Sequence, residues 1–355
     1  MNYDRAFSLG AEQSPYDPRT VQHEMTLASP LTIGGVKYNL SDIQDQSKVG
    51  ICTAISLTQN ASKYFGIKFS ADFQYLLQKK YIDGNWIEGS SIFSSLKVGK
   101  NFGFLPAEQF TFITEADRNL SYPQYVAKLQ AIPDIEIAKL LSKVSHRLTG
   151  YAQITVNDPQ LIAKAINDSK VGILCRYTVG SEWWTDKNGK PSWKTADINP
   201  IRPPKNAISG HAIGASYFNF TVIHDIYHPN TWGTDWNDEN GGNCNIDWDA
   251  YKMTEAWIPY YDFVPNVPEF SYRFAKDIRY NENNKEVSAL QTALKIDGVF
   301  PLTQPITGFY GDITRTAVLA FQKKYALINV YEATVLRGKL VGPKTRVKLN
   351  DLFDK

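Results

Sequence analysis

One cysteine stands where a helix is expected to begin. Cys52 follows Gly50, and apolar residues recur every three or four positions from Ile51 to Phe65, which is the helical period. The unpaired N–H groups and the positive dipole end of a helix N-terminus favour thiolate over thiol. This position predicts a nucleophile, but a free cysteine at a helix start is more often a small buried hydrophobe.

Three further residues could complete a catalytic set with Cys52. His211 lies in ISGHAIGASYF, where a strand is expected to begin, and Asn230 follows in HPNTWGTDW. A Cys–His pair needs a third group that holds the imidazole in one tautomer, and an Asn amide can do that. Gln46 precedes the cysteine by six residues. Its side chain and the cysteine's backbone N–H could together stabilise an oxyanion.

The segments that carry these residues resemble the motifs of the papain-like cysteine peptidases, in the same order, across residues 44–257. QSKVGICTA is similar to the nucleophile motif, with Thr after Cys instead of Trp, and SGHAIGA is similar to the histidine motif. NTWG is similar to the Asn-Ser-Trp-Gly motif. The resemblance implies that Cys52 is the nucleophile and His211 the general base and then acid. It also implies that Asn230 orients the histidine and that Gln46 donates to the oxyanion.

The same resemblance implies further contacts. Gly89 and Ser90 fall where the family has a Gly-rich edge that pairs with extended substrate backbone. Trp232 would shield the His–Asn hydrogen bond from water, and Trp236 would line the leaving-group side of the cleft.

The sequence also differs from the family pattern at two places. Val49 stands where secreted relatives have a disulfide cysteine. The stretch between the histidine and asparagine motifs holds an extra short insertion, HDIYHPN.

The remaining cysteines and histidines favour packing over chemistry. Cys175 and Cys244 lie in strand-like or turn segments, and three reduced thiols are the expectation for so few cysteines. His224 and His228 are four apart but lack a third ligand or a helical HExxH pattern, so neither a metal nor a cofactor is expected. The Trp-rich segment 181–193 could form a cleft wall or a glycan-binding platform, or could pack in the core.

The order of the expected elements predicts the fold class. With 355 residues, two domains are expected. Helices come first and strands later, which is typical of an α+β domain. The resemblance specifies a papain-like two-lobed fold, with a helical left lobe and a β-rich right lobe. We expect an N-terminal arm over 1–45, the peptidase domain over 46–262, a linker over 263–281 and a small C-terminal domain over 282–355.

The C-terminal segment is expected to be a small all-α, three-helix domain. Helical patterns cover Glu286–Lys295, Asp312–Tyr325 and Pro343–Leu352. The segment resembles the three-helix peptidoglycan-binding domain, with signature residues at 308–311 and 341–345. The resemblance implies that 282–355 binds peptidoglycan. The alternative is an appendage that only stabilises the fold or docks a protein.

Charge excludes some partners. The chain carries a net charge of +2, which argues against nucleic acid as the main partner. The charge is divided, with −4 over 1–270 and +6 over 271–355, as expected for two units with different tasks. No apolar run is long enough to span a bilayer. The N-terminal residues lack a signal-peptide pattern, so the chain either begins inside a cell or lacks its leader.

Three functions are compatible with the sequence. The first is a cysteine endopeptidase, directed to the bacterial cell wall by its C-terminal module, that hydrolyses peptide or protein substrates at the envelope. The second is a peptidoglycan endopeptidase that cuts stem or cross-bridge peptides, for example a phage endolysin. The third is a catalytically idle wall-binding or virion structural protein. The complete Cys-His-Asn-Gln set argues against idleness, and a monomer is expected. The missing leader and the absence of a long propeptide favour a lysis or virion setting.

Overall fold

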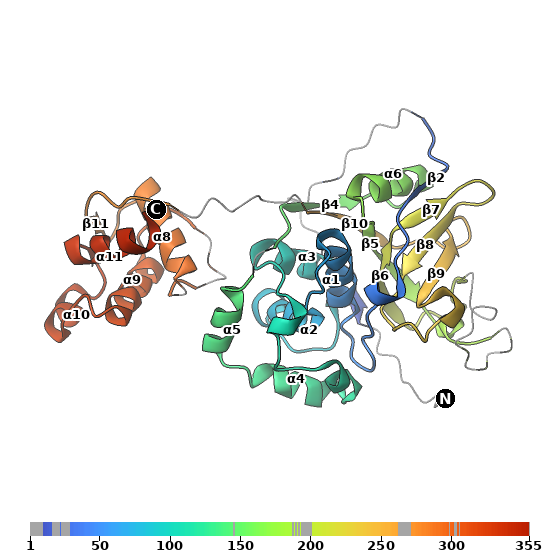
Figure 1. The fold of residues 1–355 in the computed structure, drawn as a ribbon, viewed down its shortest axis with the longest axis horizontal. Helices are drawn as coiled ribbons and strands as arrows, with labels where there is room; N and C mark the ends of the chain where they lie inside the picture. The colour runs from blue at the N-terminus through green and yellow to red at the C-terminus, as the bar shows by residue number, and fades with distance from the viewer. Residues whose placement is uncertain are drawn as a thin grey trace. The chain divides into compact units, whose positions relative to one another are not determined.

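The chain folds into two compact units, residues 1–262 and 263–355, shown in Figure 1. The computed structural model describes residues 10–15, 22, 29–144, 146–186, 188, 190, 192, 201–261, 271–297, 299–301, 304 and 306–354. Within the first unit, helices α1–α5 gather on one side and the strands on the other (Figure 1). This α+β arrangement confirms the predicted fold class, with one helical lobe and one β-rich lobe.

The helical lobe is built around α1. This helix ends at Gly66, whose φ of 68° is the left-handed conformation that glycine adopts at helix C-termini. The Ser70 side chain caps the next helix by accepting from the Phe73 N–H. Directly after α2 the chain widens into a π-helix. The helices are α1 Cys52–Phe65, α2 Ala71–Leu77, the π-helix Gln78–Asp83, α3 Ile92–Asn101, α4 Tyr122–Gln130 and α5 Asp134–Leu141, with short 3₁₀ turns at Leu40–Asp42, Ala107–Gln109 and Glu115–Asn119.

The β-rich lobe contains two antiparallel four-stranded sheets, in the orders β4-β10-β5-β6 and β2-β7-β8-β9. Helix α6, Pro159–Ser169, begins with Pro at its first position and an Asp158 cap. A separate two-residue pair, β1 with β3, is parallel. The strands are β1 Ala11–Glu12, β2 Ile33–Gly35, β3 Ser90–Ser91, β4 Gly150–Ile154, β5 Ile173–Val179, β6 Ser209–Ala215, β7 Tyr217–Asn219, β8 Asp225–Pro229, β9 Asn243–Asp247 and β10 Glu255–Tyr260, with 3₁₀ turns at Ser181–Trp183 and Asp238–Asn240.

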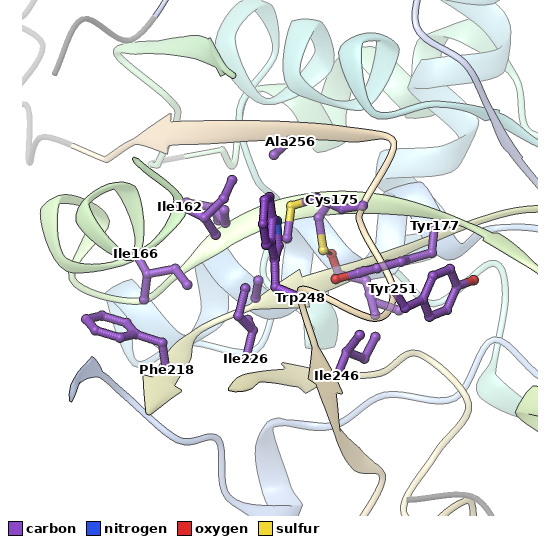
Figure 2. Packing of buried hydrophobic residues seen from close by; sticks show 14 of the residues in the cluster. Ile162, Ile166, Cys175, Tyr177, Phe218, Ile226, Ile246, Trp248, Tyr251 and Ala256 are labelled. Atoms are coloured by element: carbon purple, nitrogen blue, oxygen red, sulfur yellow. Dashed lines mark hydrogen bonds between the residues drawn. The ribbon is translucent and has the colours of Figure 1, made fainter. Parts of the chain in front are cut away.

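The core of the β-rich lobe lies where α6 and both sheets meet. Figure 2 shows Ile162 and Ile166 of α6 beside aromatic and aliphatic side chains of the strands. Cys175 and Cys244 belong to this core, and both are buried free thiols. The prediction that these two cysteines pack rather than react agrees with their place in the structure.

In its described residues, the C-terminal unit contains the three predicted helices and one more. The helices are α8 Lys285–Ile296, α9 Asp312–Lys324, α10 Val330–Leu336 and α11 Pro343–Phe353, and the short strands β11 Ile278–Arg279 and β12 Leu340–Val341 pair with each other. Its core includes Leu290, Val318, Phe321 and Leu349, all fully buried. In the described part of the chain, no helix has the length and apolar character needed to cross a membrane.

The buried His228 should make the first unit acid-sensitive. Its Nδ1 bonds to the Ile226 carbonyl and its Nε2 to the Tyr177 hydroxyl, and burial lowers its pKa to about 3. Because the unfolded imidazole titrates near 6.5, stability falls as pH drops below that value.

We expect His228→Gln to remove about 2 kcal/mol of the stability difference between pH 7 and pH 5, measured by urea unfolding. Tyr177→Phe is the control. It lowers the free energy of unfolding at both pH values, but it keeps the imidazole of His228 and therefore the pH dependence. An unchanged pH dependence in His228→Gln would contradict this assignment.

Candidate active site

The first residue of α1, Cys52, lies where the helical lobe meets the β-rich lobe. Its side chain is fully buried. The thiol is hydrogen-bonded by backbone groups of Ala212 in β6 and Gly10 in the N-terminal arm. Ala212 is the residue after His211, so the helix start and the histidine strand meet at this point.

The hydrogen bonds of Asn230 define the tautomer of His211. The Asn230 Oδ1 atom accepts from the Thr231 N–H at 2.7 Å and lies 2.8 Å from His211 Nε2. Because this oxygen can only accept, Nε2 must be the protonated nitrogen. Among the described residues, the buried Nδ1 of His211 has no hydrogen-bond partner. A lone pair on Nδ1 is therefore available to a proton donor, as a general base requires.

Aromatic side chains cover this histidine. The Trp232 ring stacks on His211 with 4.4 Å between ring centroids, as expected of a group that shields the His–Asn hydrogen bond. Trp183 meets His211 edge-on at 5.8 Å. Trp236 is fully buried, packs against both tryptophans and donates its Nε1–H to the Trp183 carbonyl. Trp236 thus supports the aromatic cluster, rather than lining a cleft wall as expected from the sequence.

Gln46 lies in the loop before α1 and is fully buried. Its backbone N–H donates to the Thr231 carbonyl at 2.8 Å, and its Oε1 accepts from the Thr231 hydroxyl at 2.8 Å. The same hydroxyl lies 3.5 Å from His211 Nε2. The structure therefore brings Gln46, His211 and Asn230 together, and Thr231 links the glutamine loop to the histidine. Cys52 lies against the backbone of Ala212, the residue after His211 in β6.

Burial determines the charge states of Cys52 and His211. It raises the pKa of the Cys52 thiol, although backbone hydrogen bonds from Ala212 and Gly10 act in the opposite direction. It also lowers the pKa of His211 to about 4, against the effect of the Asn230 bond. Both groups are consequently neutral at pH 7 in this conformation. The sequence argument that the helix N-terminus favours thiolate is outweighed here by desolvation.

The burial of Cys52 comes in part from the arm segment, residues 10–15. Strand β1 of this segment pairs in parallel with β3, and the Ser90 N–H donates to the Gly10 carbonyl at 2.7 Å. A Cβ added at Gly10 would lie 2.4 Å from the Gly50 carbonyl oxygen. The arm segment thus lies at the Gly89–Ser90 edge that was predicted to bind substrate backbone.

Two side chains of the β-rich lobe hold the other side of the arm segment. The Arg176 Nε–H donates to the Ala11 carbonyl at 3.0 Å. The Glu255 carboxylate, which is buried, accepts from the Gln13 side chain at 3.0 Å and from the Ser14 N–H at 3.1 Å. The arm segment is therefore bonded to both lobes beside Cys52.

The edge strand β3 has its own buried support. Lys79 donates from Nζ to the Gly89 carbonyl at 2.8 Å and to Asp83 at 3.0 Å. The Asp83 carboxylate also accepts from the Ser90 hydroxyl at 2.7 Å. Lys79 and Asp83 lie in the π-helix, a rare conformation that is frequent at functional sites.

Several of these residues were not found by sequence reasoning. Glu255, Arg176 and Lys79 reach the site from positions with no motif around them, so no local signal distinguished them from ordinary charged residues. Trp183 belongs to the Trp-rich segment, for which core packing and a cleft wall were both considered. Its contact with His211 places it in the aromatic cover of the site.

The first unit has the papain-like cysteine protease fold, with a cysteine at the start of α1 and, in β6, a histidine that is hydrogen-bonded to an asparagine. Xylellain, a cysteine protease from Xylella fastidiosa, has a similar crystal structure, with a TM-score of 0.59 and 16% sequence identity over 71% of this chain and 96% of that chain.

Other solved structures are also similar. Digestive procathepsin L 3 of Tenebrio molitor larval midgut gives a TM-score of 0.47 at 15% identity, covering 73% of this chain and 76% of that chain. Procathepsin B S9 from Trypanosoma congolense gives a TM-score of 0.48 at 12% sequence identity, covering 74% of this chain and 89% of that chain. No curated protein matches the chain.

The C-terminal unit matches a separate family. Residues 283–328 match the model described as "Putative peptidoglycan binding domain". The match covers α8 and α9, the two helices that supply most of the buried core of this unit. The chain therefore combines a papain-like fold with a peptidoglycan-binding-type module. In the described ranges, no group of three or more His, Cys, Asp or Glu side chains could hold a metal ion.

Replacing Gly10 should expose the thiol. Because the Cβ of Gly10→Val would collide with the Gly50 backbone, we expect the arm segment to leave and Cys52 to become hydrated. Hydration lowers the thiol pKa, so more thiolate forms at pH 7. Alkylation of the full-length protein by iodoacetamide should become at least about tenfold faster at pH 7.

Glu12→Val is the matched control, because Glu12 lies in the same segment with an exposed side chain. Peptide mapping should place the new label on Cys52 rather than on Cys175 or Cys244. Equal alkylation rates in Gly10→Val and wild type would contradict a role of the arm segment in covering the thiol.

Proposed function

We propose that this protein is a cysteine peptidase that acts at the bacterial cell wall through Cys52, His211, Asn230 and Gln46. The observation that carries the proposal is the His211–Asn230 hydrogen bond. It leaves Nδ1 as the basic nitrogen beside the helix start that holds the only cysteine not packed in the β-rich core. The papain-like fold supports the same reaction class.

In the proposed reaction, His211 Nδ1 takes the Cys52 proton and the thiolate attacks a peptide carbonyl carbon. The carbonyl oxygen becomes an oxyanion that accepts from the Cys52 N–H and the Gln46 side-chain amide. The imidazolium then gives its proton to the leaving amine, so the C–N bond breaks and a thioester remains. Water, deprotonated by His211, hydrolyses the thioester and restores the thiol.

Asn230 has an orienting role in this scheme. Its Oδ1 keeps the proton on Nε2 of His211 in the neutral state and accepts from the imidazolium when it forms. Trp232 stacks on the histidine and limits competition from water for this bond. Substrate backbone would pair with Gly89 and Ser90.

The arm segment occupies that same edge, so substrate and arm cannot bind together. The described conformation, with neutral thiol and imidazole, is the inactive one in our proposal. Turnover would begin once residues 10–15 move and water reaches the pair, because a polar environment favours the thiolate–imidazolium form.

The C-terminal module would direct this activity. Its family match supports peptidoglycan as the ligand of residues 282–355. The net charge of +6 over 271–355 would add a salt-sensitive attraction to anionic wall polymers. The substrate at the wall is a protein or a peptide of the peptidoglycan itself, and the assays below separate these two.

The triad proposal predicts graded losses of activity. The assays are amino-group release from purified sacculi and cleavage of a dipeptidyl fluorogenic substrate, with Gly10→Val as the active reference. Cys52→Ala should abolish activity, and Asn230→Ala should lower kcat by about 10²-fold or more, because the imidazole loses its orienting partner. Cys175→Ala is the control and should keep full activity.

Full activity in Cys52→Ala, or no hydrolysis of either substrate by any full-length form, would overturn the catalytic proposal. Release of amino groups from sacculi without cleavage of the small peptide would identify peptidoglycan as the substrate. Cleavage of the peptide alone would assign a protein substrate.

The module proposal predicts binding that does not depend on the cysteine. Cys52→Ala should sediment with purified sacculi at low salt, whereas a chain ending at residue 262 should remain in the supernatant. Retention of the full chain should weaken as salt is raised, because the charge attraction is screened. Equal sedimentation of both chains would remove the targeting role of residues 282–355.

A further inference from the structure

The loop that precedes α1 carries Gln46 and is held from both lobes. On one side, residue 45 forms a bridge with Trp232, and the Gly233 N–H donates to the Gln44 carbonyl at 3.2 Å. Next to Gln46, Ser47 has a φ of 53°, a left-handed conformation that is unfavourable for a residue with a side chain. A loop of this kind keeps its shape only where its surroundings determine it.

Arg118, in the 3₁₀ turn Glu115–Asn119, contacts this loop from the helical lobe. Its Nη1 donates to the Asp45 carbonyl at 2.7 Å. Its backbone carbonyl accepts from the Lys48 N–H at 3.0 Å. These two contacts lie on either side of Gln46 in the sequence, so this one residue fixes the backbone before and after the glutamine.

The guanidinium is itself held rigidly. Its Nε and Nη2 donate to the two carboxylate oxygens of Asp72 at 3.0 and 2.7 Å. Asp72 also accepts from the Tyr125 hydroxyl at 2.8 Å. Arg118 is 2% exposed and Asp72 is 4% exposed. A buried bidentate pair is costly to desolvate and adds little net stability, but its fork geometry holds the remaining donor in one direction.

We propose that Arg118 is a positioning residue for the oxyanion donor Gln46. It acts by holding the Asp45–Lys48 backbone in the one conformation that directs the glutamine amide to the reacting carbonyl. The inference rests on the proposed function, because it needs Gln46 to act on an oxyanion. A lysine would keep the charge but could not hold Asp72 with two bonds and the Asp45 carbonyl with a third.

The test compares reactions that do and do not form an oxyanion, using Arg118→Lys in the full-length Gly10→Val background. We expect kcat for the fluorogenic peptide to fall by about tenfold or more, because a misplaced oxyanion donor stabilises the transition state less. The KM should change by no more than about twofold. Alkylation of Cys52 by iodoacetamide forms no oxyanion and should stay within about twofold. Binding of a peptide aldehyde, which forms a tetrahedral adduct, should weaken in proportion to kcat.

Two comparisons separate positioning from general disorder. In a Gln46→Ala background, Arg118→Lys should cause little further loss, because its effect passes through the glutamine. Tyr125→Phe is the matched control, because it removes one hydrogen bond to Asp72 but leaves both Arg118–Asp72 hydrogen bonds in place. It should keep the kcat of the reference. If Arg118→Lys lowers alkylation as much as kcat, adds fully to Gln46→Ala, or leaves kcat unchanged, the inference fails.

Chemical rescue of Arg118→Ala provides a second test of the same inference. Arg118, Asp72 and Phe110 line an open pocket of about 340 Å³, through which a small cation can reach the space that Arg118→Ala vacates. We expect Arg118→Ala to regain kcat when millimolar methylguanidinium is added, while potassium chloride at equal concentration has no effect. If Arg118→Ala lacks the wild-type circular dichroism spectrum, the lysine variant alone decides. Absence of hydrolysis in the Gly10→Val reference itself would overturn the proposed function, and this inference with it.

Discussion

The contact between the N-terminal end of α1 and strand β6 is the interaction on which the rest of the site depends. It places the Cys52 thiol against the backbone beside His211. The helix is anchored by burial of its first ten residues, and the strand is paired with β5 along seven residues. Because both elements are rigid, the relative position of the two side chains is a property of the lobe interface rather than of a flexible loop.

That interface also decides the electrostatics of the pair. A helix N-terminus stabilises a thiolate by a modest amount at an exposed position, whereas complete desolvation of a charged group costs considerably more. With Cys52 and His211 both fully buried, desolvation prevails and the pair is neutral. The charge state of Cys52 thus depends on what covers the thiol, and the arm segment contributes to this cover.

Charged residues that are far apart in the sequence of the first unit support this arrangement. Lys79 holds the carbonyl of the β3 edge, Glu255 and Arg176 hold the arm segment, and Arg118 holds the loop before α1. Each of these side chains bonds to backbone or to an arm side chain that lies beside the site. The second unit, which contains the match to the peptidoglycan-binding family, has its own core.

The sequence by itself determined the fold class and the two-part organisation, and it led to the proposed set of four residues. These could be predicted because helix and strand periodicity, and the short motifs around Cys52, His211 and Asn230, are local patterns. Gln46 was proposed because its spacing to the cysteine resembles that of the oxyanion glutamine of the papain-like peptidases. The widening of the helix after Leu77 into a π-helix and the additional helix α10 were not predicted.

Only the tertiary structure placed the arm segment at the Gly89–Ser90 edge, Arg118 beside the glutamine loop and Trp236 in the interior. These features depend on residues far apart in the chain, and no periodicity or motif encodes which partners they meet. The neutral state of the Cys52–His211 pair is of the same kind, because desolvation depends on everything packed around the two groups rather than on their neighbours in sequence.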